Sequence, residues 1–259
     1  MEKQVDSLEL FHLKVCMINS VDQIKGNLEI VEKRMKQAST RAHRDIADIK
    51  LIVVTKSRTT NMIRKAINAG AVFLGENYAE EGVAKKIEVG DEFNIEWHMI
   101  GHIQSRKARS VAMNFNMVHS LDSIKLAVKL DRFSMAVDKI LPVLLEFNIS
   151  GEDNKFGWMA NNEDNWFELL PEIKEICKLQ NLSVSGLMSM PPFVNDPELS
   201  RPHFKQLRRL HDFLKVEMPE VNWRELSMGT SVDYEVAIEE GATMVRIGQA
   251  ILGKRNYKE

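Results

Sequence analysis

Lys56 directly follows an apolar run at residues 51–54, and its amine is the first group in the chain that suggests chemistry. Four β-formers in a row predict a strand buried on both faces, because no residue alternates to a solvated face. An ammonium group cannot stay inside an apolar sheet without a partner, so we expect Lys56 where the strand leaves the core. At the mouth of a fold, desolvation favours the neutral amine, which can form an imine with an aldehyde. The alternative is a lysine that simply marks a strand end.

Two turns near the end of the sequence carry residue types that bind phosphate. The segments Ser-Met-Gly-Thr-Ser at 227–231 and Arg-Ile-Gly at 246–248 each lie between a predicted strand and a predicted helix. Hydroxyls, bare glycine backbone and a helix N-terminus suit a phosphate dianion, since N–H groups and the helix dipole point at it. The alternative is that these residues have only structural roles, with Gly229 and Gly248 as turn glycines and Ser231 as a helix N-cap. We favour phosphate, because both neighbouring turns carry the pattern.

An imine-forming amine beside a phosphate site predicts one ligand that bears both an aldehyde and a phosphate. Pyridoxal 5′-phosphate is such a ligand, and it would span the first strand and the last two if these are neighbours in a closed barrel. Arg246 would then lie near the pyridine ring. A permanent cation facing the ring nitrogen disfavours its protonation, which weakens the cofactor as an electron sink.

The elements that must position these groups alternate along the chain, after a long amphipathic helix at residues 15–43. Strands are predicted at 51–55, 72–74, 96–100, 117–120, 142–148, 182–188, 225–228 and 244–247. Helices are predicted between them at 61–69, 78–88, 105–113, 123–137, 163–179, 196–216 and 232–240, and a short helix follows the last strand. About eight β-then-α units predict a (β/α)8 TIM barrel with an extra N-terminal helix. The alternative, a doubly wound open sheet, would want a G-x-G-x-x-G turn after the first strand, which is missing at 55–58.

Composition is consistent with one domain in the cytosol. The 259 residues suit a single barrel domain, with an N-terminal helical extension at 1–45 and the barrel at 50–253. The net charge of −2 gives no reason to expect a nucleic-acid or membrane partner, and no signal peptide or membrane span stands out. Cys16 and Cys177 lie far apart and belong to no Cys/His cluster, which argues against a disulfide framework or a zinc site.

Residues at the predicted carboxyl ends of the strands are nearly all polar, small or charged. They include Lys56, Asn77, His98, Ser120, Asp122, Asn148, Ser227 and Arg246. Functional groups of (β/α)8 barrels lie at these ends, so the scattered residues are expected to converge on one mouth.

A series of motifs runs in order from about residue 50 to the end. They are Val54-Thr55-Lys56, Gly75-Glu76-Asn77-Tyr78, the segment from Trp97 to Ser105, His119-Ser120-Leu121-Asp122, Asn148 to Glu152 with Lys155-Phe156-Gly157, Gly186-Leu187-Met188, Ser227 to Ser231, and Val245-Arg246-Ile247-Gly248. In these motifs the chain resembles the pyridoxal phosphate homeostasis proteins, which are similar to the N-terminal barrel of alanine racemase. The resemblance implies a barrel that holds pyridoxal phosphate as an imine on Lys56.

The resemblance also assigns the other site residues. It implies that Asn77 lies near the cofactor, that Arg246 faces the ring nitrogen, and that the phosphate is held by Ser227, Thr230, Ser231 and Gly248. The chain departs from the usual pattern at Thr230, where methionine is usual, and at Arg106, where asparagine is common. Residues 250–253 also replace the usual Ile-Phe-Gly ending.

We interpret the chain as a binding and delivery protein, without racemase activity, that releases pyridoxal phosphate to apo-enzymes and exists as a monomer or weak dimer. Alanine racemase needs a second domain and a tyrosine base, and the sequence is expected to lack room for that domain after Gly253. His98, His119 and Tyr78 could move protons, but each is expected to be structural. The alternatives are a pyridoxal-phosphate-dependent racemase or lyase, and an aldolase that uses Lys56 as its Schiff base.

Overall fold

A closed barrel of eight parallel strands forms the centre of the computed structural model, which describes residues 20–91 and 93–254. The barrel strands are β1 (Lys50–Val54), β2 (Phe73–Glu76), β3 (Glu96–Met99), β4 (Met117–Leu121), β5 (Leu141–Asn148), β7 (Leu182–Met188), β8 (Glu225–Ser227) and β9 (Met244–Ile247). Each strand pairs in parallel with the next around the ring; β4 pairs β5, and β9 pairs β1. The predicted (β/α)8 fold is therefore confirmed, and the pairing of β9 with β1 excludes the open sheet.

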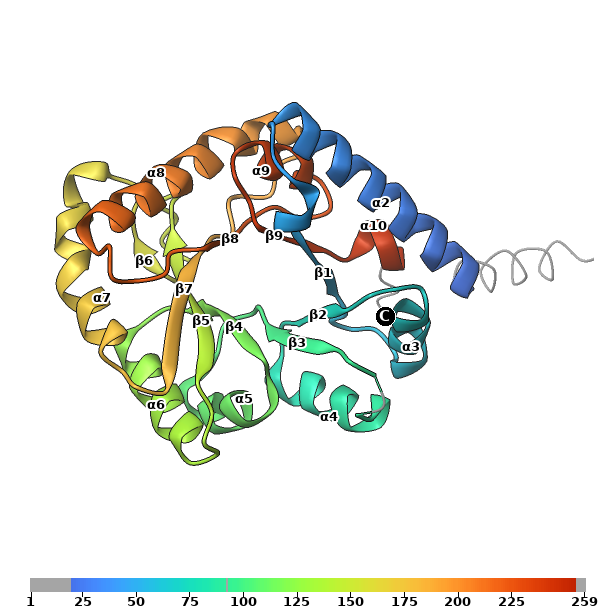
Figure 1. Ribbon diagram of the computed structural model, residues 1–259, viewed down its shortest axis with the longest axis horizontal. Helices are drawn as coiled ribbons and strands as arrows, with labels where there is room; N and C mark the ends of the chain where they lie inside the picture. Colours follow the sequence, from blue (N-terminus) through green and yellow to red (C-terminus); the bar gives the residue numbers. More distant parts are fainter. Residues whose placement is uncertain (1–19, 92, 255–259) are drawn as a thin grey trace, which may run out of the picture.

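Helices surround the barrel, as Figure 1 shows in a view down its shortest axis. They are α2 (Val21–Arg41), α3 (Thr60–Asn68), α4 (Ala79–Val89), α5 (Ala108–Asn114), α6 (Ile124–Met135), α7 (Leu170–Cys177), α8 (Arg201–Glu217), α9 (Tyr234–Glu239) and α10 (Gln249–Leu252). Short 3-10 helices are η1 (Ile46–Asp48), η2 (Ser105–Lys107), η3 (Glu163–Leu169) and η4 (Pro197–Ser200).

The predicted N-terminal helix is α2, which begins after Ser20, whose side chain accepts a hydrogen bond from the Gln23 N–H. Its buried face consists of Ile24, Leu28, Val31, Met35, Ala38 and Ser39, at helical spacing. Asn27 donates a hydrogen bond of 2.8 Å to the Ile251 carbonyl, which ties the helix to α10. The part of the prediction at residues 15–19 lies outside the described residues.

Three predicted helices begin differently from expectation, and in one of them, 105–113, the first three residues form the 3-10 helix η2 before α5 begins at Ala108. The segment 163–179 is a 3-10 helix up to Leu169 and an α-helix only from Leu170, because Pro171 has no N–H to continue an α-helical ladder. The segment 196–216 likewise opens as η4, and Pro202 sits in the first turn of α8. The two-residue strand β6 (Trp158–Met159), which pairs with the end of β5, was not predicted. A two-residue strand has too little pattern to detect.

The core has two parts, separated by the barrel wall. Outward-facing strand residues such as Val53, Val245 and Leu226 pack under the helices. A small inner cluster consists of Ile52, Met117, Leu144, Met188 and Met244. Alternation along each strand explains the division, since neighbouring side chains point to opposite faces.

We predict that Gly186→Ala strongly destabilises the barrel. Gly186 has φ +154°, and a Cβ there would lie 1.8 Å from the backbone carbonyl oxygen of Glu225 in β8. Overpacking typically costs about 1–3 kcal/mol, and a clash with rigid backbone should exceed that. Urea unfolding followed by circular dichroism measures the change.

The matched control is Gly26→Ala in α2, where a Cβ meets nothing within 4 Å. Alanine should stabilise that helix by roughly 0.5–1 kcal/mol. Equal unfolding midpoints for the two variants would contradict the packing described for β7 and β8.

Candidate functional site

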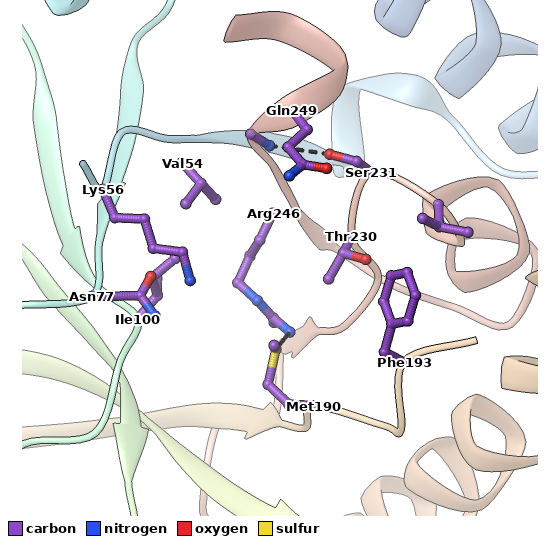
Figure 2. Close-up of a pocket in the computed structure, with 12 residues that line it drawn as sticks. Val54, Lys56, Asn77, Ile100, Met190, Phe193, Thr230, Ser231, Arg246 and Gln249 are labelled. Atoms are coloured by element: carbon purple, nitrogen blue, oxygen red, sulfur yellow. Dashed lines mark hydrogen bonds between the residues drawn. The ribbon is translucent and has the colours of Figure 1, made fainter. Parts of the chain in front are cut away.

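A pocket of about 220 Å³ opens at the carboxyl ends of the strands, where the sequence predicted convergence. Six of the seven predicted site residues line it: Lys56, Asn77, Thr230, Ser231, Arg246 and Gly248. In Figure 2, Lys56 and Asn77 enter from one side and Arg246, Thr230 and Ser231 from the other. The volume suits a small molecule of cofactor size or less, because drug-sized ligands occupy about 300–1,000 Å³.

The backbone on either side of Lys56 is held by the buried side chain of Lys85. The Lys85 ammonium donates to the Thr55 carbonyl at 2.6 Å and to Glu76 Oε1 at 2.8 Å, and it pairs with Glu81 Oε1 at 2.6 Å. Glu81 Oε1 also accepts the Ser57 N–H at 2.6 Å. Thr55 and Ser57 flank Lys56, so this network fixes the turn that carries the half-buried lysine.

Sequence reasoning missed this network. The signals were Glu81 and Lys85 at the i,i+4 spacing that pairs charges on one helix face, and Glu76 at the end of an apolar strand. Burial raises the pKa of Glu76, although the Lys85 charge and hydrogen bond oppose that rise.

Arg246 is buried at the base of the pocket and is held by three acceptors. Its guanidinium donates to Ser227 Oγ, to the Ser189 carbonyl at 2.9 Å and to Met190 Sδ at 2.9 Å. Burial lowers the pKa of Arg246 to about 10, while the negative charges of Glu146 and Asp233 oppose the shift. A pKa of about 10 leaves the guanidinium charged at neutral pH.

The two predicted phosphate turns meet at Ser231. Its Oγ accepts the N–H groups of Gly248 and Ala250, each at 3.3 Å. A Cβ at Gly248 would lie 3.2 Å from the Val54 carbonyl oxygen, so glycine permits this close approach to β1. Thr230 lines the pocket, and its N–H and its hydroxyl both donate to Asp233 Oδ1, at 2.7 and 3.0 Å. It shapes the turn through Asp233.

Asn77 and Ser227, the other two predicted residues, differ in their position relative to the pocket. Asn77 lines the pocket, and its Oδ1 is buried with no hydrogen-bond partner in the described part of the chain. A buried orphan acceptor beside a pocket fits a site that receives a ligand donor. Ser227 is not among the lining residues; it is fully buried and contacts Arg246 and His119 instead.

Glu146 of β5 is a titratable group, close enough to Arg246 to feel its charge, that the sequence reasoning did not single out. Its Oε2 is buried and lacks a hydrogen-bond partner among the described residues. Burial, with the charge of Asp122, raises the pKa of Glu146 to about 7 against the opposing charge of Arg246. The available signal was a carboxylate between Leu145 and Phe147 in the predicted strand 142–148.

Within residues 20–91 and 93–254, no group of three or more His, Cys, Asp or Glu side chains could hold a metal ion. Among the helices described in those ranges, none is long and apolar enough to cross a membrane. Cys177 is a free thiol, and Cys16 lies outside the described residues.

Comparison with known proteins places the chain in a class and then in a family. Residues 20–256 match the family model for the alanine racemase N-terminal domain, so the chain is a barrel of that class. It is 38% identical over 240 residues to the pyridoxal phosphate homeostasis protein of Vibrio alginolyticus, covering 92% of this chain and all of the relative. The corresponding protein of Escherichia coli K12 is 36% identical over 246 residues, with 92% and 100% coverage. The chain belongs to the pyridoxal phosphate homeostasis protein family.

Solved structures agree with this placement. PipY of Synechococcus elongatus, whose structure has pyridoxal phosphate bound, is 31% identical with a TM-score of 0.75, covering 89% of this chain and all of PipY. Alanine racemase of Clostridium difficile is 16% identical with a TM-score of 0.66, and the match covers 92% of this chain but 58% of the racemase. The second likeness concerns the fold alone.

We predict that Glu146→Gln stabilises the protein above neutral pH and has little effect in mild acid. The pKa of Glu146 is about 7 in the folded state and 4.5 as the ordinary value, so the folded state binds more protons between these pH values. Stability therefore falls as pH rises through this window and is level above it. The neutral amide of glutamine does not lose this stability, so the variant should exceed wild type in unfolding free energy by at most about 3 kcal/mol above pH 7.

Thermal unfolding of both proteins at pH 5 and pH 8 measures the effect. Glu168→Gln, at a carboxylate on the exposed surface, is the control variant and is measured at the same two pH values. A Glu146→Gln difference that is the same at both pH values would show that Glu146 titrates normally.

Proposed function

We propose that this protein binds pyridoxal 5′-phosphate as an imine on Lys56, keeps the concentration of free aldehyde low, and delivers the cofactor to apo-enzymes. The observation that carries the proposal is the single pocket shared by Lys56 and the turns at 230–231 and 246–248. An amine and an anion-holding turn in one small pocket match a ligand with an aldehyde and a phosphate. The bound pyridoxal phosphate of the similar PipY structure supports the same ligand.

At the phosphate end, the Ser231 hydroxyl is proposed to stop accepting backbone N–H groups when the phosphate binds. Its hydroxyl oxygen now receives the amides of Gly248 and Ala250 at 3.3 Å, which is long for such bonds. A phosphate oxygen is a stronger acceptor for the same N–H groups, and the Ser231 hydroxyl would then donate to it. Gly248 and Ser231 thus supply donors that exist before the ligand arrives.

At the ring end, Arg246 is proposed to keep the pyridine nitrogen unprotonated. A guanidinium has only donors, so it can bond the bare nitrogen but cannot accept a proton from a pyridinium. An unprotonated ring is a weak electron sink, which suits storage of the aldehyde better than amino-acid chemistry. Asn77, with its buried orphan oxygen, is proposed to accept a hydrogen bond from the cofactor.

The wild-type protein is expected to show an absorption band at the visible edge that Lys56→Ala abolishes, because the imine needs the Lys56 amine. After borohydride reduction, peptide mass spectrometry should find the pyridoxyl group on Lys56. Lys125→Ala on the exposed surface of α6 is the control, and it should retain both signals. Identical cofactor content and spectra in wild type and Lys56→Ala would exclude Lys56.

Delivery is tested by mixing the loaded protein with the apo form of a pyridoxal-phosphate enzyme and following its activity. Cofactor should transfer faster than it does from an equally concentrated loaded carrier that binds it nonspecifically, such as serum albumin. In parallel, D- and L-amino acids are incubated with the loaded protein and examined by chiral chromatography. Turnover above roughly 1 s⁻¹, an ordinary enzyme rate, would favour a racemase over a carrier.

A further inference from the structure

A line of hydrogen-bonded side chains runs through the inside of the barrel from Arg246 towards its amino end. Arg246 donates to Ser227 Oγ, and Ser227 Oγ lies 2.8 Å from Nδ1 of His119. Nε2 of His119 lies 2.9 Å from Nδ1 of His98, whose Nε2 is 3.4 Å from Oε2 of Glu96. The line begins at the candidate site and ends on the first residue of β3, and the proposed function leaves its histidines without a role.

The chemistry of the two ends fixes the direction of every hydrogen. Arg246 can only donate, so Ser227 Oγ accepts from it. The Ser227 hydroxyl proton then needs an acceptor, and the partner in reach is Nδ1 of His119. His119 must therefore carry its proton on Nε2, where it donates to Nδ1 of His98. His98 in turn donates from Nε2 to the Glu96 carboxylate.

The opposite arrangement leaves a polar group unsatisfied. With a proton on Nδ1 of His119, both neighbours of Ser227 Oγ would be donors. The serine hydroxyl proton would then have no acceptor. Ser227 and His119 are fully buried, so solvent cannot accept that proton, and such an orphan costs about 1–3 kcal/mol. Burial, followed by the positive charges of Arg246 and Lys50, lowers the pKa of His119 well below its ordinary value, which agrees with a neutral ring.

The contact with Ser227 orients the guanidinium. Nη2 of Arg246 is held by the Ser189 carbonyl and Met190 Sδ, whereas Nη1 donates to Ser227 Oγ. If the serine hydroxyl turned its proton towards Arg246, the contact would become repulsive and the planar group would lose support on one side. The Ser227 lone pair faces Arg246 only if the hydroxyl proton points elsewhere. An acceptor at the position of His119 Nδ1 is therefore required.

We propose that His119 is a positioning residue for Arg246: its bare Nδ1 orients the Ser227 hydroxyl, and His98 and Glu96 keep the proton of His119 on Nε2. This inference rests on the proposed function, because Arg246 is taken to face the ring nitrogen of pyridoxal phosphate. His119 then controls the electronic state of a ligand that it does not touch. Polar side chains inside the barrel thus orient a residue of the pocket, in addition to the apolar side chains that form the inner core.

The matched variants are His119→Asn and His119→Gln. Asparagine places its amide group near the position of Nδ1, so it keeps an acceptor for Ser227, whereas glutamine reaches the position of Nε2 and keeps only the link to His98. With pyridoxal phosphate as the probe, the asparagine variant should keep the wild-type absorption maximum and affinity. The glutamine variant should bind roughly tenfold more weakly, with its maximum shifted in the same direction as that of Arg246→Gln.

The proton position is measured without the cofactor, by ¹⁵N NMR of the histidine rings at pH 7. A neutral His119 with its proton on Nε2 is expected; a cationic ring or a proton on Nδ1 would overturn the inference even if the cofactor binds. If the glutamine variant does not fold, Ser227→Ala removes the relay hydroxyl alone and should give the same spectral shift. Wild-type spectra in every variant would also overturn the inference about His119. Wild-type protein that does not bind pyridoxal phosphate but shows the expected tautomer would contradict only the proposed function.

Discussion

The pairing of β9 with β1 is the constraint on which the site depends. In this register Ile52 lies opposite Arg246 and Val53 opposite Ile247, although the paired residues are separated by most of the chain. Closure brings the lysine after β1 next to the turns after β8 and β9, and glycine at position 248 leaves room for the close approach to the Val54 carbonyl oxygen. Without this pairing the amine and the amide donors would lie on opposite edges of an open sheet.

Burying Arg246 is costly, and the structure offsets the cost only in part. Its hydrogen-bond partners among the described residues are a hydroxyl, a carbonyl and a thioether, and the carboxylates of Glu146 and Asp233 act on it through space. Replacing buried charges by apolar residues is often neutral or stabilising, so the stability of the barrel gives no reason for this arginine. A guanidinium at the base of a pocket is better explained by what it does to a ligand.

At Lys56, one lysine supports the site and another is available to react. Lys85 is the buried cation, with the Glu76 and Glu81 carboxylates and the Thr55 carbonyl around it. This network holds the backbone of residues 55–57, so the half-buried Lys56 can project into the pocket from a fixed turn. Rigid support of this kind lowers the entropy cost of orienting a reactive group.

The sequence by itself determined the fold class, because eight apolar runs alternating with amphipathic segments fit few architectures other than a closed parallel barrel. It also determined most of the pocket: Lys56, Asn77, Thr230, Ser231, Arg246 and Gly248 follow from strand-end positions and residue types. Only the tertiary structure decided the roles that depend on contacts distant in sequence. Ser227 turned out to support Arg246, Thr230 to bond Asp233, and Lys85 to anchor the turn at Lys56. Periodicity reports which face a residue occupies, whereas hydrogen-bond partners are set by how strands far apart in the chain align across the barrel.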